Sequence, residues 1–296
     1  MEHLRKIAAV ICGAVMLAGC APNEERSSTA DTEETTAASE AENEGETFSS
    51  ELDGTMLYQS DRANIRFLRE VHDDYKYSLV LEIENLTDNQ FMVAANDIAV
   101  NGVMVNPFLY AIAEAGETTE SAIEFSVYDL ERSGIGELGS VEFSFFITDG
   151  LSEDGLESSD IITLDLREAS KPEKPDGVEL YNEGGIEISY TGMKPDESTN
   201  ARASFYISND MGKDIYVDII NIKIDGEYVA AEMYYPINDG KSRLCDMYFW
   251  DEGVLLEDSK TLEFELGAID PDTYEAYIET GSLTVDLQSM YEPEDE

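Results

Sequence analysis

The strongest constraint on the fold is an internal repeat of alternating apolar residues. Segment 79–85 places apolar side chains at every second position and ends in Asn85, and segment 203–209 repeats this pattern 124 residues later and ends in Asn209. Period-two alternation puts the apolar side chains on one face of a strand that is half-buried in a sheet. Because matching strand patterns recur at a fixed offset, the chain is predicted to contain two copies of one β module.

A hairpin signal recurs at the same offset. Asn101-Gly102 lies between apolar segments of the first copy, and Asp225-Gly226 lies at the corresponding position of the second copy. Asn-Gly and Asp-Gly tolerate the positive φ angles of a type I′ turn, whose twist matches that of the flanking strands. Each pair therefore predicts a two-residue β-hairpin.

Further along the chain the offset becomes 121 residues, which one short deletion explains. It pairs segment 163–166 with segment 284–287. A helical turn is predicted at 129–133. Seven short strand-like runs without helical periodicity are typical of a two-sheet sandwich. We therefore predict an all-β fold made of two tandem immunoglobulin-like antiparallel β-sandwich repeats after a disordered acidic tether. In the first copy the runs lie near 65–71, 77–84, 91–100, 103–110, 121–127, 140–147 and 160–166.

Composition changes along the chain predict the domain boundaries. The first repeat is assigned to 57–168 and the second to 178–290, and an acidic tail follows at 291–296. The linker at 169–177 contains two prolines and several charged residues, which favour a stiff, extended connection.

The first 19 residues have the pattern of an export signal. Arg5 and Lys6 precede an apolar run of 13 residues at 7–19, and a bilayer-spanning helix needs about 20. Leu17-Ala18-Gly19-Cys20 lies at the end of this run and resembles the bacterial lipobox. The resemblance implies cleavage before Cys20 and attachment of diacylglyceryl to its sulfur. An ordinary signal peptide or a buried helix with an incidental cysteine is the alternative.

Lipidation at Cys20 would hold the protein on the extracytoplasmic face of the cell membrane, because two acyl chains on one residue anchor a protein durably. The tether is assigned to 20–56, and its segment 21–47 contains no Val, Ile, Leu, Met or aromatic residue. Such a segment cannot bury enough apolar surface to offset the entropy of ordering, which predicts disorder. We interpret it as a spacer, and an acidic segment recognised by a basic partner is the alternative.

Three features together resemble those of a group of bacterial lipoproteins. They are the lipobox at 17–20, the Asn101-Gly102 hairpin with its apolar flanks, and the strand-like run at 141–147. The chain is similar to lipoproteins of Gram-positive bacteria that carry one or two immunoglobulin-like domains of unknown function after an acidic spacer. The resemblance implies a location and a fold, and it names no ligand.

Charge excludes one class of partner. The chain has 65 acidic and 18 basic residues and a formal net charge of −47. Nucleic-acid binding depends on neutralising phosphates with Lys and Arg, so nucleic-acid partners are excluded. A hydrophobic content of 42% is too high for a wholly disordered acidic chain. The acidic residues occur in every segment after Cys20, which favours a general role in solubility.

No catalytic residues can be named. The sequence contains none of the common hydrolase or nucleotide-binding motifs, and His72, within a charged run just before a strand, is interpreted as a loop residue. Cys245 is aligned with Ile123 of the first repeat, which predicts a thiol packed in the core. A hydrolase that uses paired carboxylates stays open, although no pair stands out among the acidic residues.

Two weaker candidate sites remain. The loop 149–160 is rich in carboxylates, the ligands that calcium prefers, but Leu151 breaks the EF-hand pattern. We interpret it as a solvated loop, with a calcium site as the alternative and no other cofactor expected. Aromatic residues on both faces of their segments are interpreted as packed against a neighbouring element, with an exposed patch that grips a protein or glycan as the alternative. The calcium candidates are Asp149, Glu153, Asp154 and Asp160, and the patch candidates are Tyr234, Tyr235, Tyr248 and Trp250.

Taken together, the sequence predicts a lipid-anchored lipoprotein that acts as a non-catalytic binding or envelope-associated module. Its partners would be the membrane, through the lipid on Cys20, and a protein or glycan of the cell envelope. A carboxylate-based hydrolase similar to glycosidases and a purely structural stalk are the alternatives.

Overall fold

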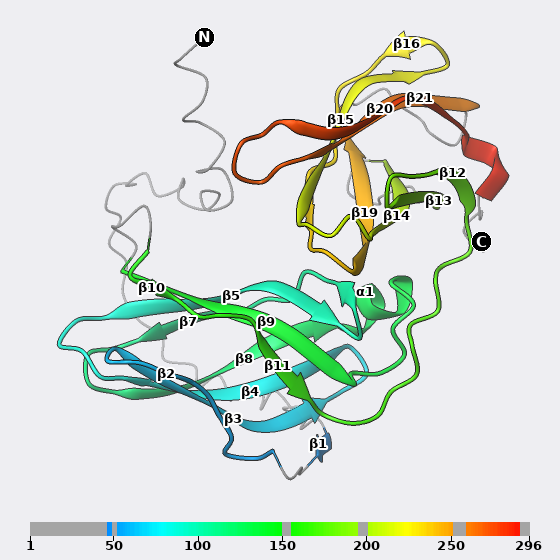
Figure 1. The fold of residues 1–296 in the computed structure, drawn as a ribbon. Helices are drawn as coiled ribbons and strands as arrows, with labels where there is room; N and C mark the ends of the chain where they lie inside the picture. Colours follow the sequence, from blue (N-terminus) through cyan, green and yellow to red (C-terminus); the bar gives the residue numbers. More distant parts are fainter. Residues whose placement is uncertain (1–45, 49–51, 150–154, 195–200, 251–258, 291–296) are drawn as a thin grey trace, which may run out of the picture. The chain divides into compact units, whose positions relative to one another are not determined.

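Antiparallel strands make up nearly all of the regular structure in the computed structural model (Figure 1). The structure describes residues 46–48, 52–149, 155–194, 201–250 and 259–290. The predicted all-β, sandwich-like fold class is confirmed over these ranges. The lipobox at 17–20 and the tail at 291–296 lie outside the described residues. Among the described residues, no helix is long and apolar enough to span a bilayer.

The first repeat has two layers of strands. In one layer β4 lies between β3 and β8, and β1 and β2 both pair with β3. In the other layer β5 pairs with β6 and β7 and with β9, and β10 and β11 pair with β9. The strands are β1 (Glu46–Phe48), β2 (Met56–Gln59), β3 (Ala63–His72), β4 (Lys76–Asn85), β5 (Phe91–Val100), β6 (Val103–Met104), β7 (Tyr110–Ala113), β8 (Thr118–Ser126), β9 (Ser140–Thr148), β10 (Glu157–Ser158) and β11 (Ile162–Asp165).

The second repeat has the same plan. β14 lies between β13 and β19, and β15 lies between β20 and the short strands β16 and β18. β12 extends the first layer, β21 extends the second, and β17 pairs with β19. The strands are β12 (Val178–Glu183), β13 (Ile186–Lys194), β14 (Arg202–Asn209), β15 (Ile215–Ile224), β16 (Glu227–Tyr228), β17 (Ala231–Glu232), β18 (Tyr235–Ile237), β19 (Lys241–Phe249), β20 (Thr261–Ile269) and β21 (Ala276–Asp286), with a 3-10 turn at Leu287–Met290.

Strand register repeats at the offsets found in the sequence. Val100 of β5 lies opposite Val141 of β9, and Ile224 of β15 lies opposite Leu262 of β20. The same two strands carry a register shift at equivalent places, between Asn96 and Ala99 in β5 and between 220 and 223 in β15. A bulge is a specific local feature rather than a general property of strands. Its recurrence therefore identifies the two modules as copies of one design.

Both predicted hairpin turns are present. Asn101 and Gly102 have φ angles of 52° and 88°, and Asp225 and Gly226 have φ angles of 49° and 86°. Positive φ at both central residues defines a type I′ turn, and the flanking residues pair across it in each copy.

A buried asparagine organises the same corner in each repeat. The Asn85 side-chain amide donates to the backbone carbonyls of Asn89 and Ala113, at 2.8 and 2.9 Å. Asn209 donates to the carbonyls of Lys213 and Ile237, both at 2.9 Å. Because a buried carbonyl without a donor is costly, each asparagine stabilises the loop that follows its strand.

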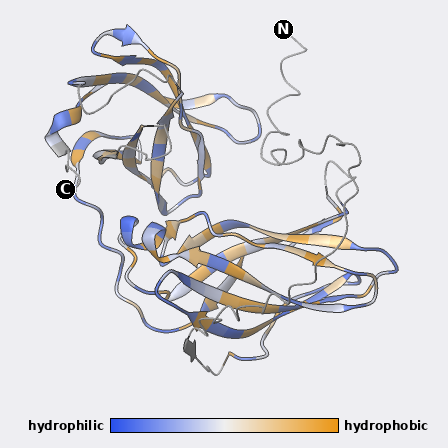
Figure 2. Ribbon diagram, turned by 180° about the vertical axis from the view of Figure 1, so that it is seen from behind, coloured by the Kyte–Doolittle hydropathy of each residue, from blue (hydrophilic) through white to orange (hydrophobic). Residues whose placement is uncertain are grey.

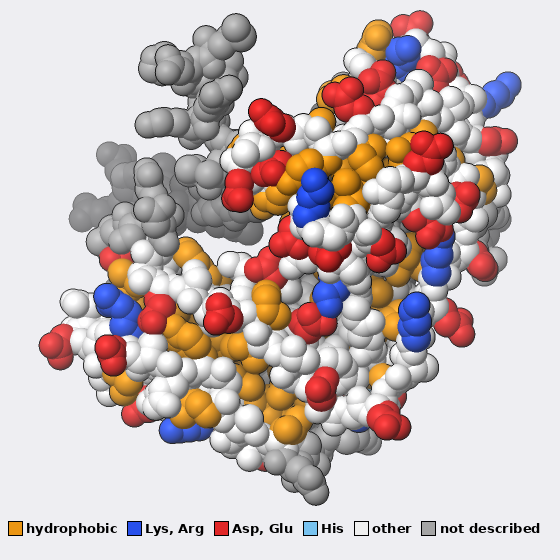
Figure 3. All heavy atoms as spheres, in the orientation of Figure 1, with side chains coloured by type: hydrophobic (Ala, Val, Ile, Leu, Met, Phe, Trp, Pro, Cys, Tyr) orange, Lys and Arg blue, Asp and Glu red, His pale blue; other side chains and the backbone are white. Residues whose placement is uncertain are grey.

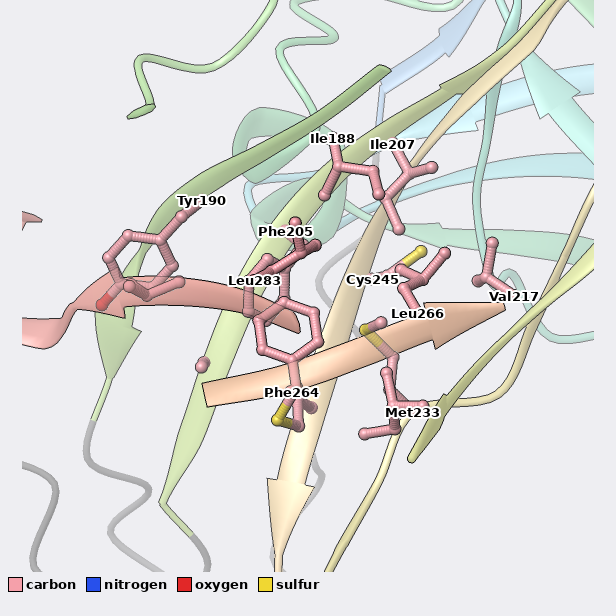
Figure 4. Close-up of a cluster of buried hydrophobic side chains, with 14 of the residues drawn as sticks. Ile188, Tyr190, Phe205, Ile207, Val217, Met233, Cys245, Phe264, Leu266 and Leu283 are labelled. Carbon is pink, nitrogen blue, oxygen red and sulfur yellow. The ribbon is translucent and has the colours of Figure 1, made fainter. Parts of the chain in front are cut away.

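Each repeat has its own apolar core, and apolar and polar residues alternate along the strands (Figure 2). In the second core the rings of Phe205 and Phe264 meet edge to face, with centroids 5.1 Å apart (Figure 4). Cys245 is fully buried there, as predicted for a core thiol, and burial raises its pKa to about 12. Its alignment with Ile123 is wrong by two positions, because strand register matches Ile123 to Met247.

The sheets of the two repeats join. β6 of the first repeat pairs in parallel with β19 of the second, with Val103 opposite Ser242 and Met104 opposite Arg243. The Ser242 amide donates to the Gly102 carbonyl at 3.2 Å. The first hairpin thereby extends the β12–β13–β14–β19 layer into one sheet of 11 strands.

The linker is held against the first repeat at the end of its one described α-helix, α1 (Val127–Arg132). Ser126 caps the helix start, since its side chain accepts from the Asp129 amide, and Gly134 follows the helix end with a φ of 76°. The Glu173 amide donates to the Gly134 carbonyl at 3.1 Å. A Cβ at position 134 would lie 1.8 Å from the Glu173 carbonyl oxygen, so only glycine allows this close approach.

Several local predictions are wrong. β1 lies within the segment assigned to a disordered tether, and it forms because its backbone pairs with the edge of β3. The predicted run 103–110 is divided into β6 and β7, which pair with the same strand, β5. The predicted helical turn at 129–133 is confirmed as α1, which spans Val127–Arg132 and so begins two residues earlier. His72 ends β3 rather than lying in a loop, and its ring stacks on Tyr77 with centroids 4.0 Å apart.

Candidate functional site

A cavity of about 170 Å³ is lined by residues of both repeats. A cavity of about 150 Å³ holds a benzene ring, so this one has room for a small organic molecule. Pairing of β6 with β19 brings the chain after the first hairpin next to the strand that carries Arg243 and Asp246. The lining comes from the hairpin exit (Met104, Val105, Asn106), from α1 and its end (Asp129, Arg132, Ser133), and from the second repeat (Arg202, Tyr235, Arg243, Leu244, Asp246, Tyr248).

One carboxylate organises the polar wall of the cavity. Asp246 accepts two hydrogen bonds from Arg132, at 2.7 and 3.1 Å, and a third from the Ser204 hydroxyl at 2.6 Å. A guanidinium Nη1 of Arg202 lies 3.7 Å from the same carboxylate. Burial lowers the pKa of Arg132, but the hydrogen bonds and negative charge of Asp246 raise it above its ordinary value overall. This ion pair links α1 of the first repeat to β19 of the second.

Arg243 is the unusual residue of the cavity. It is only 4% exposed, and no carboxylate of the described residues lies within 4.0 Å of its guanidinium. Nη1 of Arg243 donates to the Pro236 carbonyl at 3.0 Å, and Nη2 donates to the Asn106 side chain. The buried Nε has no acceptor among the described residues. Burial lowers the pKa of Arg243, since the charged form loses hydration. Proteins normally pair a buried charge, so a buried arginine without a carboxylate partner among the described residues is unusual.

Arg202 carries a second unused donor. Its Nη2 donates to the Tyr128 hydroxyl at 3.2 Å, while its buried Nε has no acceptor within the described part of the chain. Two guanidinium groups that line one cavity therefore each carry a buried Nε donor without an acceptor among the described residues.

Aromatic and aliphatic side chains form the rest of the wall. The Arg243 guanidinium lies over the Tyr235 ring, 5.0 Å from its centroid, and the Tyr235 hydroxyl donates to the Asp246 carbonyl at 3.3 Å. Burial raises the pKa of Tyr235. Tyr248, Leu244 and Met104 add apolar surface. A ligand would thus meet both charge and apolar contacts.

The charge of the lining differs from that of the chain. Three arginines and two aspartates give the cavity wall a formal charge of +1, whereas the chain carries −47. Asp and Glu side chains are scattered over the face of the molecule drawn in Figure 3. An anion in the cavity would therefore meet a locally positive wall within an acidic protein.

The predicted aromatic patch is only partly assembled. Tyr235 and Tyr248 line the same cavity. Tyr234 instead stacks on Tyr216, with centroids 4.8 Å apart, and Trp250 is 55% exposed and does not line the cavity. Tyr235 is the first residue of β18, whereas Tyr234 precedes that strand.

The calcium candidates are only partly described. Asp149 and Asp160 are exposed, and Glu153 and Asp154 lie outside the described residues. Within the described ranges no group of three His, Cys, Asp or Glu side chains could hold a metal ion.

Sequence reasoning missed the arginines, although a signal was present. Arg243 has the same strand parity as Cys245 and Met247, whose side chains are buried in the core. A charged residue at an inward-facing position is a candidate binding residue, because its burial needs compensation.

Comparison with known proteins identifies no family. No family model matches the chain, and no curated protein matches it. Among solved structures, red sea bream transglutaminase is 8% identical with a TM-score of 0.22, and the match covers 77% of this chain and 31% of that one. The exo-chitosanase CsxA of Amycolatopsis orientalis is 12% identical with a TM-score of 0.23, over 79% of this chain and 29% of that one. The chain spans less than a third of these proteins, and likeness of this degree carries no argument about activity.

Proposed function

We propose that this protein is a lipid-anchored, extracytoplasmic binding protein whose ligand occupies the cavity lined by both repeats. The observation that carries the proposal is the buried guanidinium of Arg243, which lines a cavity of about 170 Å³ and has no carboxylate partner among the described residues. A buried charge without a partner is costly to keep in a fold, and binding a ligand there would offset that cost.

A non-catalytic role is part of the proposal. Both oxygens of Asp246 are occupied by Arg132, and one of them also accepts from Ser204. A carboxylate that accepts hydrogen bonds from two neighbours in this way is a poor general base, because its lone pairs are already engaged. The cavity therefore favours binding over hydrolysis, and its size favours a small ligand over a polymeric glycan.

The immunoglobulin-like assignment belongs to the same proposal. In the first repeat, the layer β3–β4–β8 would match strands A, B and E of an immunoglobulin constant-type domain. The layer β5–β9–β11 would match strands C, F and G of the same domain. This strand order supports an immunoglobulin-like origin for both repeats.

The anchoring part of the proposal rests on the sequence of the lipobox. Cells that express the wild-type chain or Cys20→Ser should be fractionated after labelling with a radioactive fatty acid. We expect label and membrane association for the wild type and loss of both for Cys20→Ser. Equal membrane association of the two proteins, without label, would contradict the lipid anchor.

The binding part is tested by native mass spectrometry of the full chain purified from its own cells. We expect a co-purifying small molecule that is lost in Val105→Trp, because the larger side chain would fill the cavity that Val105 lines. Ile112→Trp is the matched control, since Ile112 is 46% exposed and does not line the cavity. Absence of any bound molecule, or its retention in Val105→Trp, would contradict the proposed site.

A further inference from the structure

The donors without acceptors limit the chemistry of a ligand in this cavity. A guanidinium has five N–H donors in a planar fork, and it has no acceptor. Arg243 uses Nη1 and Nη2 for Pro236 and Asn106, while the Nε groups of Arg243 and Arg202 have no acceptor among the described residues. A ligand that contacts these guanidinium groups must bring acceptor atoms, and a negative charge would complement theirs.

The charge of the wall limits the ligand further. Asp129 and Asp246 also line the cavity, so the three arginines leave a formal excess of one positive charge. A monoanion neutralises that excess, whereas a dianion such as phosphate would leave a net negative charge in a partly buried site. Planar carboxylates match the guanidinium fork, which favours a carboxylate over a spherical anion.

Apolar residues of the wall limit the chemistry of the part of the ligand that lies beyond its carboxylate. Met104, Leu244 and the rings of Tyr235 and Tyr248 line the cavity beside the arginines. A ligand with a short aliphatic chain or one ring would bury apolar surface against them, and the volume of about 170 Å³ admits a group of that size.

We infer that the cavity takes a small organic monocarboxylate, whose oxygens accept hydrogen bonds from the guanidinium groups of Arg243 and Arg202. This inference rests on the proposed binding function and names its ligand class. Arg132 is a positioning residue, because its two hydrogen bonds to Asp246 fix the position of that carboxylate in the cavity wall.

The test is isothermal titration calorimetry of the full chain at constant ionic strength and neutral pH. Sodium butyrate and sodium benzoate serve as probes, with butyramide, benzamide and inorganic phosphate as comparison ligands. We expect at least one carboxylate to bind at least tenfold more tightly than its amide and than phosphate. Equal affinity for an acid and its amide, or preference for phosphate, would overturn the monocarboxylate class.

Arg243→Met tests the residue. Methionine has an unbranched, uncharged side chain, so the variant keeps apolar contacts while it removes a buried charge that has no carboxylate partner among the described residues. We expect carboxylate affinity to fall at least tenfold in Arg243→Met and to change less than twofold in Arg69→Met, whose arginine is exposed and pairs with Glu120. Unchanged affinity in Arg243→Met would overturn the assignment.

Misfolding of Arg243→Met, or a co-purifying ligand that is not a carboxylate, would each have a defined consequence. If Arg243→Met does not fold, as judged by its thermal melt, the acid-to-amide ratio of the wild type and the affinity of Arg202→Met decide the inference. If a neutral compound or a phosphate co-purifies with the wild type and is lost in Val105→Trp, the proposed function stands and the monocarboxylate class fails.

Discussion

Asp246→Asn should destabilise the protein strongly, because it removes the carboxylate that accepts two hydrogen bonds from Arg132 in the cavity wall. The side chains of Arg132 and Asp246 are 14% and 10% exposed, and their shorter contact is 2.7 Å. Breaking a buried ion pair by removing one partner costs about 3–5 kcal/mol. Because asparagine keeps the shape and one acceptor, we expect about 3 kcal/mol. In a unit of this size that loss lowers Tm by roughly 6–12 °C.

The assay is urea unfolding followed by circular dichroism, with thermal melts in parallel. Glu82→Gln is the matched control, because Arg66 and Glu82 form an ion pair at 2.8 Å whose side chains are 36% and 32% exposed. Exposed pairs contribute about 0–1 kcal/mol, so the control should lose no more than that. A loss for Asp246→Asn as small as for Glu82→Gln, or a coupling energy with Arg132→Met below about 0.5 kcal/mol, would refute the reasoning.

Three further predictions concern other parts of the fold. Asn209→Ala removes the donor to the buried Ile237 carbonyl and to the partly buried Lys213 carbonyl, and it should lower the free energy of unfolding by about 1–3 kcal/mol in urea titrations. Gly134→Ala should cost more than about 1 kcal/mol in the same assay, because its Cβ would meet the Glu173 carbonyl oxygen and its φ is 76°. Hydrogen bonds from Tyr277 and from backbone amides lower the pKa of Asp270 to about 2. Its stabilising contribution is therefore present above pH 3.8 and is lost as the pH falls towards 2. The difference in free energy of unfolding between the wild type and Asp270→Asn should vanish over that range.

Matched variants control each of these experiments. Asn182→Ala removes an exposed asparagine, and Gly136→Ala adds a Cβ where no atom lies within 4 Å. Glu279→Gln removes an exposed carboxylate from the strand that carries Tyr277. Losses in the controls as large as in the test variants would contradict the proposed contacts, as would a pH-independent difference for Asp270→Asn.

The repeat and its hairpins could be predicted from sequence because their signals are local. Alternation along β4 and β14 and the Asn-Gly and Asp-Gly turns determine strand and turn geometry without distant partners. The short strand β1 could not be predicted, since three residues carry no periodicity and the strand forms only by pairing with β3.

The candidate site was harder to predict because it depends on contacts between the copies. Two residues of β6 pair with β19, and this pairing brings Asn106 to Arg243. No local pattern in either segment specifies that contact. Tyr235 and Tyr248 were found as part of an aromatic patch, but Tyr234 stacks on Tyr216 and Trp250 lies beyond the end of β19, and neither lines the cavity.

The most direct test of the proposed ligand site is a titration of the ¹³C-tyrosine-labelled full chain with sodium benzoate or butyrate, observed by NMR. Tyr235 and Tyr248 line the cavity, whereas Tyr228 is 72% exposed and does not line it. We expect the ring signals of Tyr235 and Tyr248 to shift with saturation while those of Tyr228 stay in place, with Tyr→Phe variants used for assignment. Unmoved signals of Tyr235 and Tyr248 at saturating carboxylate, or equal shifts at Tyr228, would contradict binding in the cavity.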